Sequence, residues 1–458
     1  MYPTMTSIPE NTPKTPPPPT PHNYLEDEKV ITPSSWLNKP PPDVGTKFGL
    51  HNHLLSEVTL SSDYRPLSQH VFSKQVSCRG VATEQKSSGR CWLFAALNMV
   101  RSSGFIEQYN LPSSFEFSQS YLFFWDKFER VNYLLNTFEE TKQEPLDGRL
   151  MQFLLKEPMG DGGQWQMFVN LVEKYGLVPK SVYPETKHSS YSTGLNMVLT
   201  KKVREYCRDI RSRKSSVSKK EMLRQVYELL VRFLGSPPTQ FSWEYYAKDG
   251  KFNRVSMLTP LKMYRDVVKT PLTNYVSLIH DPRNEYGKTY GVEHLQNVSE
   301  GLPVIHLNVP IKTMATLIKA SIDANEPVWF GCDVGQFFRS QSCIMDEQCF
   351  NMSKYLNTEF SLNKRERLEF GESMMTHAML ITGYNEDEFG NINRWEIENS
   401  WGNNGPTKGY YAMTDTWMRE YVYQITVRND FLSDQQKKNS SDETFAKFSP
   451  WDPMGALA

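Results

Sequence analysis

The stretch Gln85-Lys-Ser-Ser-Gly-Arg-Cys91-Trp-Leu-Phe-Ala-Ala-Leu-Asn-Met-Val100 decides the fold of this chain. Its first half is polar and turn-forming, whereas its second half is apolar almost all round. The change predicts a tight loop that enters a buried helix at Cys91. A thiol at a helix start meets the positive end of the helix dipole and unpaired N–H groups, and both favour the nucleophilic thiolate. A buried structural cysteine is the alternative, and Gly89 argues against it because a glycine corner leaves the thiol accessible.

Two later motifs supply what a thiolate nucleophile needs. Residues 376–378, Thr-His-Ala, begin a predicted strand, and residues 398–402, Glu-Asn-Ser-Trp-Gly, end another. The imidazole of His377 can serve as cationic partner and as proton donor to the leaving group. The amide oxygen of Asn399 can orient that imidazole, and Trp401 can shield the bond between them from water. Taken singly, His377 reads as an ordinary core or surface histidine and Asn399 as part of an Asn/Gly turn.

Gln85 lies six residues before Cys91 and is the candidate for an oxyanion site. Its amide N–H can point at the oxyanion that develops when the thiolate attacks a carbonyl, beside the backbone N–H of Cys91. One such donor contributes roughly 3–4 kcal/mol in comparable enzymes. The chain thus carries, in this order, Gln85, Cys91, His377 and Asn399. Together they indicate nucleophilic catalysis by a cysteine.

Composition narrows the class of protein. The 458 residues carry 51 Lys and Arg against 52 Asp and Glu, which excludes a chain built as a polycation for nucleic acid. No run of 18 apolar residues occurs, so we expect no membrane partner. The first 30 residues lack an apolar core and an arginine, which predicts a cytoplasmic protein with reduced thiols. The six cysteines form no CxxC pair, and Cys343 and Cys349 have no nearby histidine, so we predict no metal and no cofactor.

Periodicity predicts helices in the first two thirds of the chain and mostly strands in the last third. The predicted helices are 116–128, 165–175, 196–235 and 311–324. The predicted strands are 275–279, 328–334, 376–382, 394–398, 410–413 and 423–427. This order favours an α+β fold over a doubly wound sheet.

The Gln-x5-Cys-Trp motif, the strand histidine and Asn-Ser-Trp-Gly together resemble the papain-like cysteine peptidases. Within them, longer strings are similar to the bleomycin hydrolase branch of cytosolic aminopeptidases. These strings are QKSSGRCWLFAALN at 85–98, GDGGQW at 160–165, KYGLVPKSVYPET at 174–186, VWFGCDVG at 328–335, THAMLITGYN at 376–385, WEIENSWG at 395–402 and PWDPMGALA at 450–458. The likeness runs from about residue 46 to residue 458. Glu84 departs from it, since the family is expected to have Asn before the Gln.

The resemblance implies a two-lobed papain-like fold, with a helical lobe, a β-barrel-like lobe and a large helical insertion. It implies a cysteine aminopeptidase that removes N-terminal residues from peptides and hydrolyses the carboxamide of bleomycin. The implied roles are Cys91 as nucleophile, His377 as general acid and base, Asn399 as its orienter, Gln85 as oxyanion donor, and Gly162, Gly163, Trp401 and Ala458 as substrate-binding residues.

Spacing places the insertion. His377 follows Cys91 by 286 residues, whereas papain-like enzymes separate the pair by roughly 130–150. The predicted parts are a disordered extension at 1–45, which holds 12 of the 29 prolines, a helical lobe at 46–195, a mainly helical insertion at 196–334, a β-rich lobe at 335–445 and a C-terminal arm at 446–458. By resemblance, the insertion assembles a homohexamer whose active sites face an inner cavity.

Two further segments carry expectations of their own. By resemblance, the arm lies in the active-site cleft, where the carboxylate of Ala458 can pair with the free α-amino group of a peptide substrate. Residues 201–224 are rich in Lys and Arg and form either a solvated or subunit-contacting helix face or a basic patch for nucleic acid. Two rival functions stay open: a peptide ligase or acyltransferase that uses the same thioester, and a nucleic-acid-binding protein with a vestigial peptidase site.

Overall fold

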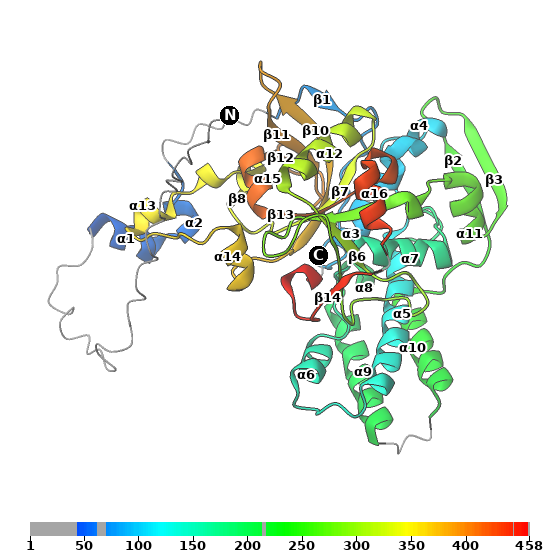
Figure 1. The fold of residues 1–458 in the computed structure, drawn as a ribbon. Helices are drawn as coiled ribbons and strands as arrows, with labels where there is room; N and C mark the ends of the chain where they lie inside the picture. The colour runs from blue at the N-terminus through cyan, green and yellow to red at the C-terminus, as the bar shows by residue number, and fades with distance from the viewer. Residues whose placement is uncertain (1–43, 62–69, 213–216, 443, 457–458) are drawn as a thin grey trace, which may run out of the picture. The chain divides into compact units, whose positions relative to one another are not determined.

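The computed structural model describes residues 44–61, 70–212, 217–442 and 444–456 (Figure 1). Nearly all of the proline-rich extension predicted at 1–45 lies outside these residues. The chain forms two compact units, residues 1–58 and 59–458. The first contains the short helices α1 (Val44–Asn52) and α2 (Leu55–Val58). The second contains every predicted site residue, and the rest of the description concerns it.

A large mixed sheet forms the framework of the second unit. Its strand order is β14 (Ala446–Phe448), β5 (Thr289–Val292), β6 (Ile305–Asn308), β4 (Tyr275–Ile279), β13 (Val422–Arg428), β7 (Val328–Cys332), β10 (His377–Glu386), β11 (Ile392–Glu398), β12 (Tyr410–Thr414), β9 (Ile344–Met345) and β8 (Phe338–Arg339), with β1 (Lys74–Gln75) beside β10. The α+β composition expected from the sequence is therefore confirmed.

Strand β10 separates two hydrophobic cores. Its register with β7 runs from His377 opposite Cys332 to Ile381 opposite Val328. Because successive side chains of a strand point to opposite faces, Ala378 belongs to the core with the helices, whereas Met379 belongs to the core behind the sheet. Burial on both faces therefore fixes the position of His377 at the start of the strand.

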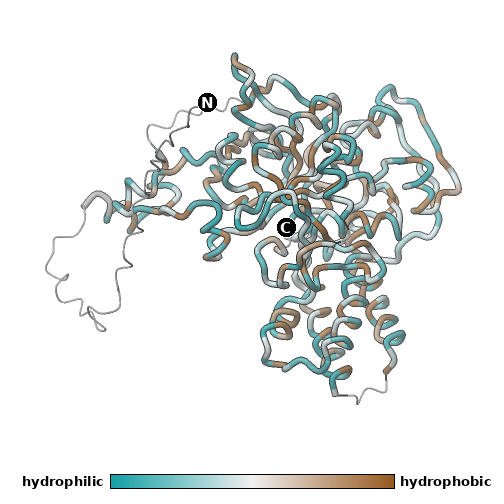
Figure 2. The backbone as a smooth tube through the Cα atoms, viewed as in Figure 1, coloured by the Kyte–Doolittle hydropathy of each residue, from teal (hydrophilic) through white to brown (hydrophobic). Residues whose placement is uncertain are grey.

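Helix α3 (Cys91–Val100) is buried along all ten of its residues. It packs against β10, α5 (Gln119–Glu140) and α7 (Trp165–Tyr175). Figure 2 shows hydrophobic segments gathered around α3 and the middle of the sheet. The helix is buried because it carries apolar side chains all round, as the sequence predicted.

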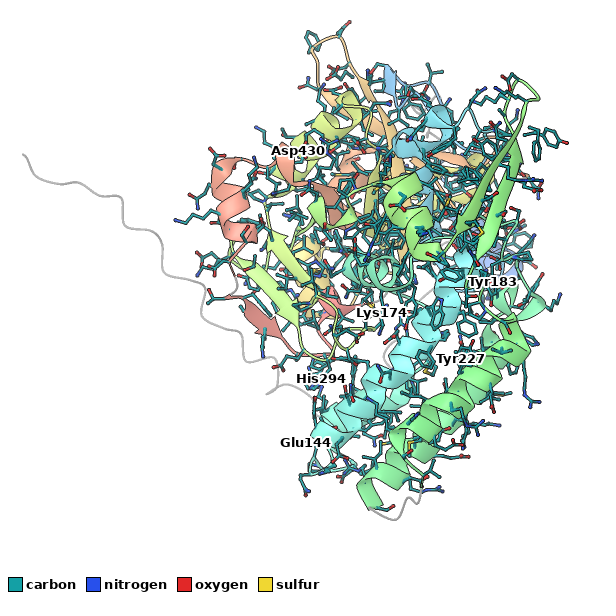
Figure 3. The ribbon with its side chains drawn as sticks, turned by 90° about the vertical axis from the view of Figure 1, so that its right-hand side faces the viewer. Glu144, Lys174, Tyr183, Tyr227, His294 and Asp430 are labelled. Carbon is teal, nitrogen blue, oxygen red and sulfur yellow. The ribbon has the colours of Figure 1, made fainter. Side chains whose placement is uncertain are left out.

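The range 196–235, predicted as one helix, contains two. Helix α9 covers Thr193–Ser212 and α10 covers Lys219–Leu234. The hydroxyl of Ser218 accepts the backbone N–H of Glu221 and caps the start of the second helix. In the turned view of Figure 3, α5 and α10 lie side by side, and the ring of Tyr227 on α10 meets Phe124 of α5 edge-on.

The segment 196–334, predicted as a mainly helical insertion, contains strands as well as helices. The range 196–334 holds α9 and α10, and also the two-stranded hairpin of β2 (Phe241–Tyr246) and β3 (Phe252–Leu258), helix α12 (Ile311–Asp323), and β4, β5, β6 and β7 of the main sheet. No helix among the described residues is long and apolar enough to cross a membrane.

Candidate active site

Cys91 begins helix α3 at the corner that the sequence predicted. The residue is 2% exposed, and the backbone N–H of Ala378, on β10, contacts its thiol. Burial raises the pKa of Cys91 to about 11, and the N–H groups of Ala378 and Trp92 act in the opposite direction. The expected lowering of this pKa at the helix start is therefore wrong for the resting site, because desolvation outweighs the backbone N–H groups that favour the thiolate.

His377 and Asn399 form the predicted pair. The imidazole Nε2 lies 2.9 Å from the amide oxygen Oδ1 of Asn399, which leaves Nδ1 as the nitrogen available to the thiol. Trp401 lies with its ring centroid 4.9 Å from that of His377 and covers the pair on its outer side. Burial lowers the pKa of His377 to about 4, and the hydrogen bond to Asn399 acts against this lowering.

Gln85 is held beside this pair by backbone pairing. Its N–H donates to the carbonyl of Ser400 across 2.8 Å, and the N–H of Gly402 donates to the carbonyl of Thr83 across 2.9 Å. Its side-chain Oε1 accepts the hydroxyl of Ser400, and Nε2 donates one of its two hydrogens to the carbonyl of Ser88. The second hydrogen of Nε2 is available to a ligand, as an oxyanion donor requires.

The glycine loop at residues 160–163 packs directly against the nucleophile segment. The indole N–H of Trp92 donates to the carbonyl of Asp161 across 2.8 Å. A side chain at Gly163 would place its Cβ 2.4 Å from that indole, so only glycine fits there. The structure thus places Gly163, predicted as a substrate-binding residue, next to the residue that follows Cys91.

Asp161 is a site residue that sequence reasoning missed. Its carboxylate accepts the backbone N–H of Gly89 across 3.0 Å and the side-chain amide of Asn196 across 2.6 Å. The buried ammonium of Lys127 lies 2.7 Å away and holds the pKa of Asp161 well below its usual range, against the effect of burial. The sequence signal for this residue is a charged side chain between Gly160 and Gly162, just before the largely buried helix α7, because a charge in such a place needs a counter-ion.

The C-terminal arm reaches the same loop. The amide Nε2 of Gln164 donates to the carbonyl of Ala456 across 2.6 Å. Farther back, Met454 is buried, and the guanidinium of Arg283 lies 2.9 Å from the carboxylate of Asp452. Ala458, the predicted partner of the substrate amino group, lies outside the described residues.

The sequence-predicted residues therefore meet from three directions. Cys91 comes from α3, His377 from the start of β10, and Asn399 from the segment after β11. Gln85 joins them through its backbone bond to Ser400. Within the described ranges no group of three His, Cys, Asp or Glu side chains is placed to hold a metal ion. A thiol, an imidazole and an amide in this order can perform acyl transfer through a thioester.

The chain is similar to known proteins over most of its length. The model of the Peptidase C1-like family matches residues 36–455. Bleomycin hydrolase of Homo sapiens is 41% identical over 453 residues, which cover 95% of this chain and 99% of that protein. Aminopeptidase C of Lactococcus lactis subsp. lactis is 42% identical over 383 residues, which cover 82% of this chain and 86% of that protein.

A solved structure extends the likeness to the fold. The crystal structure of PepW from Lactobacillus rhamnosis HN001 matches with a TM-score of 0.88 at 38% identity, covering 93% of this chain and 97% of that one. The papain-like α+β fold expected from the sequence is thereby confirmed. The chain belongs to the Peptidase C1-like family, as a cysteine aminopeptidase of the bleomycin hydrolase and aminopeptidase C type.

Proposed function

We propose that Cys91 is the nucleophile of this aminopeptidase, with His377 as general acid and base, Asn399 as its orienter and Gln85 as the oxyanion donor. The observation that carries the proposal is the hydrogen bond of 2.9 Å between His377 Nε2 and Asn399 Oδ1. His377 begins strand β10, and the N–H of the next residue, Ala378, contacts the thiol of Cys91. One nitrogen of the imidazole is thus committed to orientation, and the other is left for proton transfer.

The reaction starts from a neutral pair. Burial favours the uncharged thiol and the uncharged imidazole, so the thiol proton moves to Nδ1 of His377 as the sulfur attacks the first peptide carbonyl. The carbonyl oxygen becomes an oxyanion between the N–H of Cys91 and the second hydrogen of Gln85 Nε2. The C–N bond then breaks, and His377 returns the proton to the leaving amine.

Water completes the cycle. It attacks the thioester carbonyl while His377 accepts one of its protons, the C–S bond breaks, and the proton returns to the sulfur of Cys91. The products are the N-terminal amino acid and the shortened peptide. By likeness to human bleomycin hydrolase, we propose that the carboxamide of bleomycin is a second substrate.

We propose that the C-terminal arm restricts the enzyme to free N-termini. Support comes from the bond between Gln164 and Ala456, which brings the arm to the loop that holds Gly162 and Gly163. In this proposal Ala458, expected from the sequence as the partner of the substrate amino group, pairs its carboxylate with the α-ammonium of the substrate and blocks longer extensions. An anion at this place attracts a cationic amine and offers nothing to a blocked one.

The test compares aminoacyl amide substrates with free and with acetylated N-termini. We expect hydrolysis of the free form by the wild-type chain and none by Cys91→Ala. Hydrolysis of the free form by Cys91→Ala at the wild-type rate contradicts the nucleophile assignment. Equal hydrolysis of the acetylated form by the wild-type chain contradicts the proposal that the C-terminal arm restricts the enzyme to free N-termini. Adding a free amine acceptor tests the ligase or acyltransferase alternative, which predicts transfer products in place of the free amino acid.

The homohexamer, the cytoplasmic address and nucleic-acid binding through 201–224 stay predictions. In that segment Lys202 lies 2.7 Å from Glu205, Arg208 lies 2.8 Å from Asp209, and Arg224 lies 2.7 Å from Glu221. These pairs lower the free positive charge, which favours the solvated or subunit-contacting face over a nucleic-acid site. Sedimentation analysis tests the hexamer, and salt-dependent binding of single-stranded DNA tests the basic patch.

A further inference from the structure

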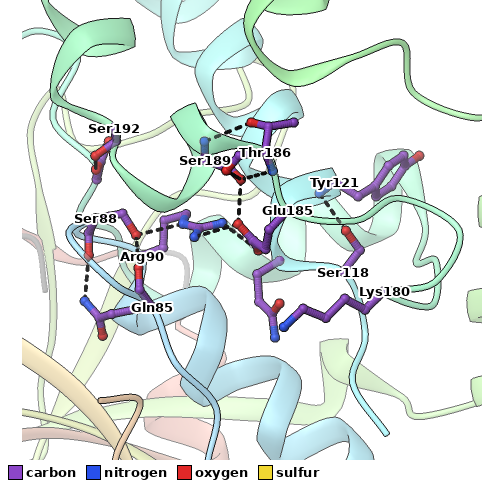
Figure 4. A network of polar contacts seen from close by, with 12 residues as sticks. Gln85, Ser88, Arg90, Ser118, Tyr121, Lys180, Glu185, Thr186, Ser189 and Ser192 are labelled. Carbon is purple, nitrogen blue, oxygen red and sulfur yellow. Dashed lines mark hydrogen bonds and ion pairs between the residues drawn. The ribbon is translucent and has the colours of Figure 1, made fainter. Parts of the chain in front are cut away.

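A closed hydrogen-bond loop fixes the amide of Gln85 (Figure 4). Its Nε2 donates to the carbonyl of Ser88 across 2.6 Å. In return, the hydroxyl of Ser88 donates to the backbone carbonyl of Gln85 across 2.7 Å. The direction of the second Nε2 hydrogen, the one proposed to meet the oxyanion, therefore depends on the position of the Ser88 carbonyl together with that of the Ser400 hydroxyl, which donates to Oε1.

Arg90 links Ser88 to a partly buried ion pair with Glu185. Its Nε donates to the hydroxyl oxygen of Ser88 across 2.9 Å. Its Nη1 donates to Oε1 of Glu185 across 3.0 Å, and its Nη2 lies 2.9 Å from Oε2 of the same carboxylate. The guanidinium is fully buried and lies over the rings of Phe94 and Phe123, at 5.1 and 5.3 Å from their centroids. A planar guanidinium that is held by both oxygens of one carboxylate and by a hydroxyl is fixed in one orientation.

Glu185 is itself held by the start of a helix. Its Oε2 accepts the hydroxyl of Ser189 across 2.5 Å. Ser189 and Thr186 form the reciprocal capping box that begins α8 (Lys187–Ser190). Helix α8 therefore fixes the carboxylate, the carboxylate fixes Arg90, and Arg90 fixes Ser88 beside the nucleophile.

We infer that Glu185 is a positioning residue for the oxyanion site, acting through Arg90 and Ser88 on the amide of Gln85. The inference rests on the oxyanion role proposed for Gln85. Without its negative charge, the buried guanidinium of Arg90 has lost its counter-ion and must move toward water. The hydroxyl of Ser88 then loses a donor, so the backbone carbonyl that accepts Gln85 Nε2 is held less firmly, while Oε1 keeps its bond to the hydroxyl of Ser400.

The experiment compares Glu185→Gln with Glu116→Gln. Glu116 is a matched control because its carboxylate also pairs with a cation, Lys180 at 2.8 Å, and its side chain is also 20% exposed, as is that of Glu185. We expect Glu185→Gln to lower kcat about tenfold with an unchanged KM, short of the roughly 10²–10³ that loss of a whole oxyanion donor costs. Glu116→Gln should change neither constant.

Two readouts separate positioning from general damage. A peptide aldehyde with a free N-terminus forms a tetrahedral adduct whose oxygen occupies the oxyanion site, so Glu185→Gln should weaken its binding about tenfold. Alkylation of Cys91 by iodoacetamide needs no oxyanion donor and should keep its rate. Ser88→Ala leaves the ion pair intact and should give the same pattern, which covers the case in which Glu185→Gln does not fold.

A double-mutant cycle decides the outcome. On the background of Gln85→Ala, Glu185→Gln should cause no further loss of kcat. A further tenfold loss on that background, or an equal fall in the alkylation rate, overturns the positioning role. If instead Gln85→Ala alone leaves kcat unchanged, the proposed oxyanion role itself fails, and the two failures are thereby distinguished.

Discussion

The side-chain amide of Gln164 donates a hydrogen bond to the backbone carbonyl of Ala456 across 2.6 Å, and so ties the end of the chain to the glycine loop beside the nucleophile. Gln164 is fully buried and lies immediately before helix α7. A buried side-chain donor with a single acceptor on the arm acts as a tether, because breaking the bond leaves the amide unpaired away from water.

Loss of this tether should change substrate specificity. In Gln164→Leu we expect the arm to detach from the glycine loop part of the time, so that cleavage of N-acetylated peptides rises relative to cleavage of free aminoacyl substrates. Deletion of residues 455–458 should shift the ratio further. Gln166→Leu is the control, since Gln166 donates to Asn170 on its own helix. A ratio in Gln164→Leu equal to that of the control contradicts the tether.

Removal of the oxyanion donor should lower kcat and spare binding. In Gln85→Ala we expect a loss of kcat of about 10²–10³ with little change in KM, because the donor meets charge that develops only in the transition state. Steady-state kinetics on a free aminoacyl substrate measures both constants. An equal rise in KM with kcat retained would assign Gln85 to ground-state binding instead.

The glycine loop should tolerate a methyl group at one end and not at the other. A Cβ at Gly163 lies 2.4 Å from the indole of Trp92, whose N–H is bound to Asp161, whereas a Cβ at Gly160 has its nearest neighbour, the side chain of Glu157, at 3.7 Å. We expect Gly163→Ala to cost about 1–3 kcal/mol of stability and to lower kcat/KM, because Trp92 must move and it adjoins Cys91. Urea unfolding and kinetics should show Gly160→Ala near wild type. Matching behaviour of the two variants refutes the packing argument.

Acid should destabilise the fold through buried histidines. Burial lowers the pKa of His280, His306 and His377 to about 4 from an ordinary value of 6.5. Between these pH values the unfolded chain binds protons that the folded chain does not, so stability is full above pH 6.5 and falls as the pH drops toward 4. Each histidine contributes at most about 3 kcal/mol.

His306 isolates this effect from catalysis. It is 1% exposed, with Nδ1 2.8 Å from the hydroxyl of Ser277. We expect His306→Gln to reduce the slope of unfolding free energy against pH between 6.5 and 4, and the same change at the exposed His70 to leave it unaltered. Urea titrations at a series of pH values give the slope. A slope in His306→Gln equal to that of the wild type speaks against neutral burial of this residue.

Local patterns predicted the elements whose ends are set by local chemistry. The helix predicted at 165–175 has those bounds in the structure, because Gly176 leaves the helical region with φ of 75°. The strand predicted at 275–279 is equally well bounded. The hairpin of β2 and β3 was missed although the sequence carries its signal, because Phe241, Trp243 and Tyr245 alternate with the polar Ser242 and Glu244.

Contacts between distant segments explain what the sequence did not yield at the site. Arg90 and Glu185 are 95 residues apart in the sequence. A local sequence pattern does not predict which distant residue pairs with a buried charge. The pKa of Cys91 was predicted in the wrong direction for the same reason. The helix start is visible in the sequence, whereas the desolvation that outweighs it comes from burial against distant segments such as β10, whose Ala378 N–H contacts the thiol.

The central claim is that one thiol of six carries the reaction, and labelling tests it most directly. All six cysteines are free and buried, and Cys91 is the one that meets the N–H of the strand bearing His377. Treatment with limiting iodoacetamide, followed by peptide mapping, should place the label on Cys91, with aminopeptidase activity lost in proportion to its occupancy. Full activity in a chain whose Cys91 is completely alkylated would contradict the account.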